Sequence, residues 1–86
     1  MLSKQLLRCG TSIGTNIAEA NGAISKNDFS AKMSIAYKEC LETKYWLYLL
    51  KDSGDLDLES FNNLFDKADE IGRILFSILK TTRISK

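Results

Sequence analysis

One catalytic motif matches this chain by its letters, a G-x-S-x-G pentapeptide at residues 10–14 centred on Ser12. In hydrolases this pattern places the serine on a strained turn between a strand and a helix, where a histidine takes the hydroxyl proton. The chain contains no histidine, and Ser12 lies inside an amphipathic helical pattern. We therefore interpret the match as accidental and expect no catalytic residue.

The residues that could bind a metal ion do not form a recognisable ligand set. Cys9 and Cys40 lie far apart in the sequence, and without histidine they cannot complete a tetrahedral zinc centre in one chain. Glu39 and Glu42 share one side of a predicted helix beside Trp46, where a solvated or salt-bridged surface is favoured over a metal site. No phosphate-binding loop is present. We expect no metal and no cofactor.

The basic residues offer a better candidate, a surface for nucleic acid. The net charge is only +1, but residues 1–51 carry +3, residues 52–70 carry −6 and residues 71–86 carry +4. For a single subunit a solvated helix face is the favoured interpretation, whereas a symmetric oligomer would repeat the charges around its axis. The candidate phosphate contacts are Lys4, Arg8, Lys26 and Lys32.

The elements that must position these residues are helices, because the 86-residue chain has no proline and its apolar residues recur at helical spacing. Three long helices are predicted at about residues 2–21, 26–53 and 57–82, in a single all-α domain with an antiparallel up-and-down bundle. Ser25 is expected to cap the second helix, and Asp55 or Asp57 the third. Gly22 and Gly54 are expected to end the first two helices in the left-handed conformation.

The second helix carries the widest apolar surface of the three. One row runs from Phe29 to Leu50, and a second row adds Tyr37, Leu41 and Tyr48. Together the rows cover more surface than one neighbouring helix needs. We expect the first row to hold the other two helices and the second row to contact a further helix.

Packing within the bundle or between subunits is expected at two small residues and six large ones. Gly10 and Gly14 lie one turn apart on the first helix, which favours a tight crossing with another helix over a kink. The set comprises Gly10, Gly14, Tyr37, Leu41, Trp46, Tyr48, Phe65 and Phe76.

The cysteines and the start of the chain indicate the cellular compartment in which the protein is expected. Cys9 and Cys40 fall on apolar faces, which favours buried reduced thiols over a disulfide. Nothing at the start resembles a signal peptide, and the longest apolar runs are too short to cross a membrane. We expect a cytoplasmic protein without a membrane segment.

The sequence resembles the bacterial four helix bundle proteins, also called 23S ribosomal RNA intervening-sequence proteins. The resemblance is carried by residues 5–20, above all 8–19, and then by Phe29, Lys32, Lys38, Glu39, Glu42, Thr43, Trp46 and Leu47. It implies an up-and-down bundle that assembles as a ring-like homopentamer, similar in fold to accessory proteins of diversity-generating retroelements, which bind a reverse transcriptase and nucleic acid. Family members usually carry a further helix before the segment matching residues 2–7, so we expect this chain to share helices with neighbouring subunits.

Two hypotheses about function follow. The leading one is a non-enzymatic helical oligomer that binds nucleic acid, specifically structured RNA. The alternative is a protein-binding scaffold or accessory subunit that packs against a partner helix or a polymerase. The identity of the RNA or protein partner and the number of subunits are left open by the sequence.

Overall fold

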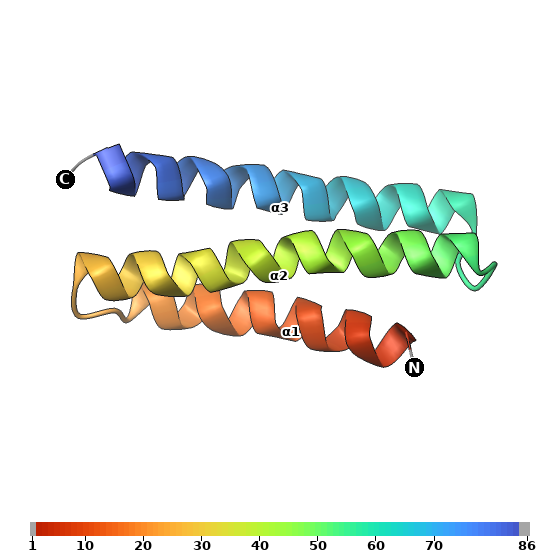
Figure 1. The fold of residues 1–86 in the computed structure, drawn as a ribbon, viewed down its shortest axis with the longest axis horizontal. Coiled ribbons are helices and arrows are strands. Elements are labelled where there is room, and N and C mark those ends of the chain that lie inside the picture. The colour runs from red at the N-terminus through yellow and green to blue at the C-terminus, as the bar shows by residue number, and fades with distance from the viewer. Residues whose placement is uncertain (1, 85–86) are drawn as a thin grey trace.

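A computed structural model of the protein describes residues 2–84. Within this range the chain forms α1 (Leu2–Asn21), α2 (Lys26–Asp52) and α3 (Leu58–Ile84), and no strand. Successive helices run antiparallel in a molecule that measures 45 by 21 by 13 Å (Figure 1). The predicted all-α, up-and-down arrangement is confirmed for this chain. The helix α3 extends beyond its predicted end at residue 82.

The start of α2 and the start of α3 are fixed by side-chain caps. The Ser25 hydroxyl accepts a hydrogen bond from the Asp28 amide at 3.1 Å, as predicted. The Asp57 carboxylate accepts one from the Ser60 amide at 3.0 Å, which identifies Asp57 as the cap of α3. Each cap satisfies a backbone donor that has no partner inside its helix.

The two glycines at the helix ends behave differently. Gly54 follows α2 with a φ of 83° and donates its amide to the Lys51 carbonyl, in agreement with the prediction. The prediction for Gly22 was wrong, because Gly54 is the only glycine with positive φ among residues 2–84. Instead, the Gly22 and Ala23 amides donate to the carbonyls three residues earlier, so α1 ends by tightening its last turn.

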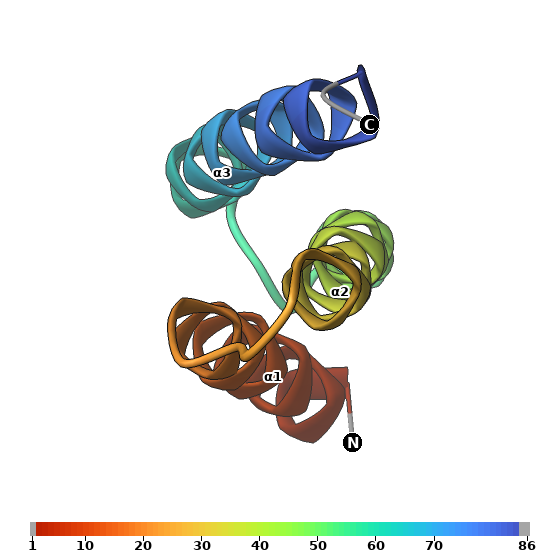
Figure 2. The ribbon, with the colours of Figure 1, turned by 90° about the vertical axis from the view of Figure 1, so that its left-hand side faces the viewer.

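The middle helix, α2, holds the other two. Figure 2 shows α1 and α3 on different sides of α2, and within residues 2–84 no Cα of α1 comes within 8 Å of a Cα of α3. The prediction that α2 has neighbours on two sides is therefore confirmed. Its buried residues are Met33, Ala36, Cys40, Thr43, Leu47 and Leu50.

The second apolar row of α2 contacts α3, so its assignment to a further helix was wrong for two of three residues. The Tyr37 ring lies 5.9 Å from the ring of Phe76, and the Tyr48 ring lies 5.3 Å from that of Phe65. The reason is that α3 covers both rows of α2, since Cys40 of the first row also contacts it at Ala68. Leu41, the third member, is 47% exposed.

None of the described helices combines the length and the hydropathy that a membrane span requires.

Candidate functional site

Arg8 links α1 to α2 through two ion pairs. Its Nη2 donates to Glu42 Oε1 at 2.7 Å, and its Nη1 donates to Glu39 Oε2 at 3.4 Å. A spacing of three residues places both carboxylates on one side of α2, where α1 lies. The sequence-based preference for a salt-bridged surface at Glu39 and Glu42 is confirmed.

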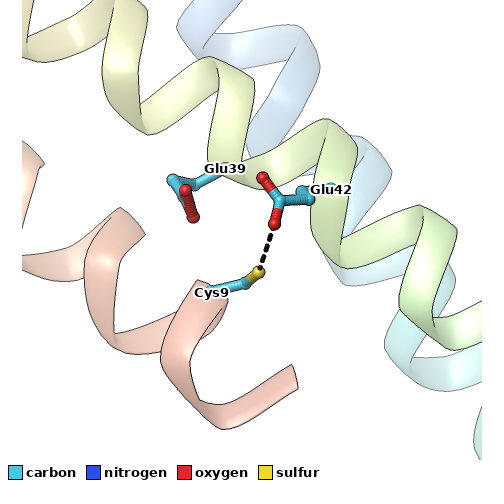
Figure 3. A group of neighbouring side chains, drawn as sticks. All are labelled: Cys9, Glu39 and Glu42. Carbon is cyan, nitrogen blue, oxygen red and sulfur yellow. Dashed lines mark hydrogen bonds between the residues drawn. The ribbon is translucent and has the colours of Figure 1, made fainter. Parts of the chain in front are cut away.

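A third potential ligand, Cys9, lies beside these carboxylates (Figure 3). The Cys9 Sγ lies 3.7 Å from Glu42 Oε1 and 3.4 Å from Arg8 Nη2, and the residue is fully buried. The candidate ligand atoms of Cys9, Glu39 and Glu42 lie within 4.8 Å of one another. Sequence reasoning missed this group because it compared Cys9 with Cys40, not with glutamates on another helix.

The electrostatics of the cluster indicate a structural role. Burial, followed by the Glu42 carboxylate, raises the pKa of the Cys9 thiol above its ordinary value, so the thiol stays protonated at neutral pH. The Cys9 sulfur and the two glutamates raise the pKa of Arg8. The guanidinium thus already supplies the positive charge that a metal ion would bring, and the cluster is best described as an ion-paired joint between α1 and α2.

The four predicted phosphate contacts do not share one surface. Lys4 lies near the start of α1 and Lys26 at the start of α2, which are opposite ends of the long axis (Figure 1). Arg8 is held by the two glutamates, and Lys32 pairs with Glu19 at 2.8 Å. The Glu19 partner raises the pKa of Lys32. Binding of nucleic acid by these four residues stays a prediction.

Five exposed lysines form no ion pair within residues 2–84. Two of them come from distant parts of the sequence, since Lys26 begins α2 and Lys80 lies in the last turns of α3. Antiparallel packing brings these helix ends to the same end of the bundle (Figure 1). Lys80 was missed because α3 was considered for its apolar side alone. The full set is Lys4, Lys26, Lys38, Lys67 and Lys80.

The predicted glycine crossing is not formed between the helices of this chain. No other part of the described chain comes within 4 Å of a Cβ built at Gly10 or Gly14. The close approach occurs instead at Gly72, where a Cβ would lie 3.4 Å from Cys40 Sγ. That thiol donates to the Ala68 carbonyl at 2.9 Å. Contact of Gly10 and Gly14 with another subunit stays a prediction.

The predicted packing residues with large side chains differ in their surroundings. Phe65 stacks on Phe61 at 5.3 Å between ring centroids, whereas Phe76 is 53% exposed. Trp46 contacts the ring of Tyr45, and its indole N–H is buried without a hydrogen-bond partner in the described part of the chain.

Ser12 lies inside α1, where the strand-to-helix turn of the hydrolase motif cannot form. Its hydroxyl accepts a hydrogen bond from the Asn16 side chain at 3.2 Å.

Comparison with known proteins gives a family and structural likenesses. A family model described as 23S rRNA-intervening sequence protein matches residues 1–77. A crystal structure from Bacteroides thetaiotaomicron, described as a protein of unknown function from the S23 ribosomal protein family, is 46% identical and superposes with a TM-score of 0.91. The match covers 93% of this chain and 74% of that chain. No curated protein matches significantly.

Proposed function

Because this chain belongs to the 23S rRNA-intervening sequence protein family, we propose that it is a non-enzymatic helical protein that binds structured RNA as a homo-oligomer. The observation that carries the proposal is the family match over residues 1–77, whose description refers to ribosomal RNA. The segregated charge supports it, since residues 71–86 carry four basic groups and no acidic one.

The ion pairs change which residues we assign to the phosphates. Arg8 and Lys32 would each give up a carboxylate partner to bind a phosphate. Lys26 and Lys80 are exposed, form no ion pair within residues 2–84, and lie at one end of the bundle. We assign the principal phosphate contacts to Lys26 and Lys80.

The test is the affinity for an RNA duplex, measured by fluorescence anisotropy over a series of salt concentrations. Each lost lysine contact lowers the slope of log K against log salt by about one. The magnitude of this slope should therefore be smaller by about two for the Lys26→Ala/Lys80→Ala variant than for the unmodified protein. Lys67→Ala is the matched control, because this exposed lysine lies among Asp66, Asp69 and Glu70. The proposal fails if the protein binds neither the duplex nor an RNA hairpin, or if its affinity is the same at all salt concentrations.

A second candidate function is a protein-binding scaffold, and one observation favours it. Leu64, Ile71 and Ile74 lie along α3 and are 42%, 38% and 55% exposed. A row of exposed large apolar residues is typical of a surface that another helix covers.

Native mass spectrometry tests whether this row joins subunits or binds a different protein. If it joins subunits, Ile74→Glu should shift the protein towards the monomer, and Asn62→Glu, at another exposed position of α3, should not. A protein that stays monomeric at every concentration and binds no hydrophobic dye would remove the basis for the scaffold function.

A further inference from the structure

An open cavity lies at the end of the bundle where the α1–α2 turn meets the last turns of α3. One part, of about 490 Å³, is lined by Ile24, Lys26, Phe29 and Thr81 among others. A second part, of about 400 Å³, is lined by Phe29, Ser77 and Thr81 among others. The two parts share Phe29 and Thr81 in their linings, and we refer to them together as the recess. Both parts are open to solvent.

The lining combines three kinds of group. Phe29 is half-buried and offers an aromatic wall, and Ile24, at the rim, is 97% exposed. Thr81 donates its hydroxyl proton to the Ser77 carbonyl at 2.9 Å, so its oxygen can still accept a hydrogen bond. Lys26 is exposed and forms no ion pair within residues 2–84. The recess thus presents an apolar wall, hydroxyl groups and one positive charge side by side.

We propose that this recess binds one unpaired nucleotide of an RNA, with the base against Phe29 and Ile24 and the adjoining phosphate near Lys26. An unpaired base has an exposed flat face and a polar edge, which such a lining can contact, whereas a base inside a duplex is already stacked and paired. The inference rests on the proposed RNA-binding function and adds the kind of RNA: a strand with an unpaired loop or end. Part of the recess lies beyond residue 77, where the family match ends.

The first experiment compares two RNA probes that have the same base composition and number of phosphates. One is a hairpin with an unpaired loop, and the other is a blunt duplex. Stacking of a single base corresponds to roughly a tenfold gain in affinity, so the hairpin should bind about tenfold more tightly than the duplex. Equal affinity for the two probes would overturn the inference and leave the proposed function standing. Binding of neither probe would overturn both.

The second experiment fills the recess without removing a core residue. Thr81 is an exposed position of α3, so Thr81→Phe places a ring in the recess while the helix is kept. Hairpin affinity should fall about tenfold, and duplex affinity should not change. Thr11→Phe makes the same change at an exposed position of α1 that does not line the recess. Circular dichroism checks that both variants are folded. Unchanged hairpin affinity in folded Thr81→Phe would overturn the inference.

Discussion

The two helix interfaces of this chain are built from different side chains, although both use α2. Between α1 and α2 the side-chain contacts include ion pairs, with Arg8 joined to Glu39 and Glu42, and Lys32 joined to Glu19. Between α2 and α3 the contacts are mainly aromatic. They include Tyr37 with Phe76, Tyr48 with Phe61 and Phe65, and Lys51 over the Phe61 ring at 4.4 Å.

This difference indicates which interface is stronger. Aromatic rings bury the largest apolar area per residue, and ring pairs add a further attraction. Ion pairs near the surface contribute little, and the Arg8 side chain is 51% exposed. We therefore expect α1 to separate from α2 more readily than α3 does, so that amides of α1 exchange with solvent first.

The largest effect is expected from breaking the aromatic interface at Phe61, which is 6% exposed. Phe61→Ala should lower the free energy of unfolding by about 3–5 kcal/mol. Ile13→Val, at the buried centre of α1, should lower it by about 0.5–1.5 kcal/mol. Urea unfolding measures both values, and Phe61→Leu, which keeps most of the volume, serves if the alanine variant does not fold. A loss for Phe61→Ala no larger than the loss for Ile13→Val would show that the Phe61 ring contributes little to its interface.

The next effect concerns Gly72, where α3 contacts Cys40 of α2. In Gly72→Ala the new methyl group lies 3.4 Å from Cys40 Sγ, at the short limit of ordinary van der Waals contact, and alanine favours the helix by about 0.5–1 kcal/mol. This variant should be at least as stable as the unmodified protein. Gly72→Leu adds volume that cannot fit and should lower the free energy of unfolding by about 1–3 kcal/mol. Thermal melting followed by circular dichroism distinguishes the two, and a stable Gly72→Leu protein would show that the contact is loose.

The sequence predicted the helices well because their signals are local. Ser25 and Gly54 act through backbone groups within a few residues, and the buried row of α2 repeats at helical spacing. The sequence did not predict which flank of α2 each helix covers. Tyr37 and Tyr48 belong to the second row, and the placement of α3 beside this row brings them to Phe76 and Phe65.

The candidate sites were harder to predict because each joins residues from different helices. Lys26 and Lys80 lie at one end of the bundle only because the chain folds back on itself, and Arg8 reaches Glu42 across 34 residues of sequence. Glycine was also ambiguous, since the same residue type marks open surface at Gly10 and a close contact at Gly72.

A third effect is expected from alanine substitutions at Gly10 and Gly14. Each lies on an exposed part of α1, where alanine meets no other atom of the described chain within 4 Å. If no other subunit contacts this surface, each alanine should raise the free energy of unfolding by about 0.5–1 kcal/mol. If another subunit packs there, the Gly10→Ala/Gly14→Ala variant should instead dissociate at a higher concentration, as measured by native mass spectrometry. Loss of stability without dissociation would fit neither arrangement.

A smaller effect is expected at the ionic joint between α1 and α2. Arg8→Gln leaves Glu39 and Glu42 without their cation, so the melting temperature should fall and should depend less on salt than that of the unmodified protein. Arg73→Gln is the matched control, because Arg73 is 77% exposed and pairs with Asp69 on its own helix. Equal effects of the two variants would mean that Arg8 does not help to hold α1.

The smallest effect is a dependence on pH at the other interface. Lys44 holds the pKa of Asp69 below its ordinary value, so folding is stabilised while Asp69 is ionised. This stabilisation is present above the unfolded pKa of about 3.9 and is lost as the pH falls through the lower folded value. Asp69→Asn should therefore be less stable than the unmodified protein at pH 7 and should lose less stability on acidification. The control is Asp66→Asn, because Asp66 is exposed and forms no ion pair in the described part of the chain. Its stability should match that of the unmodified protein at both pH values. If acid unfolding of Asp69→Asn matches that of the unmodified protein, the α2–α3 interface depends on its apolar contacts alone.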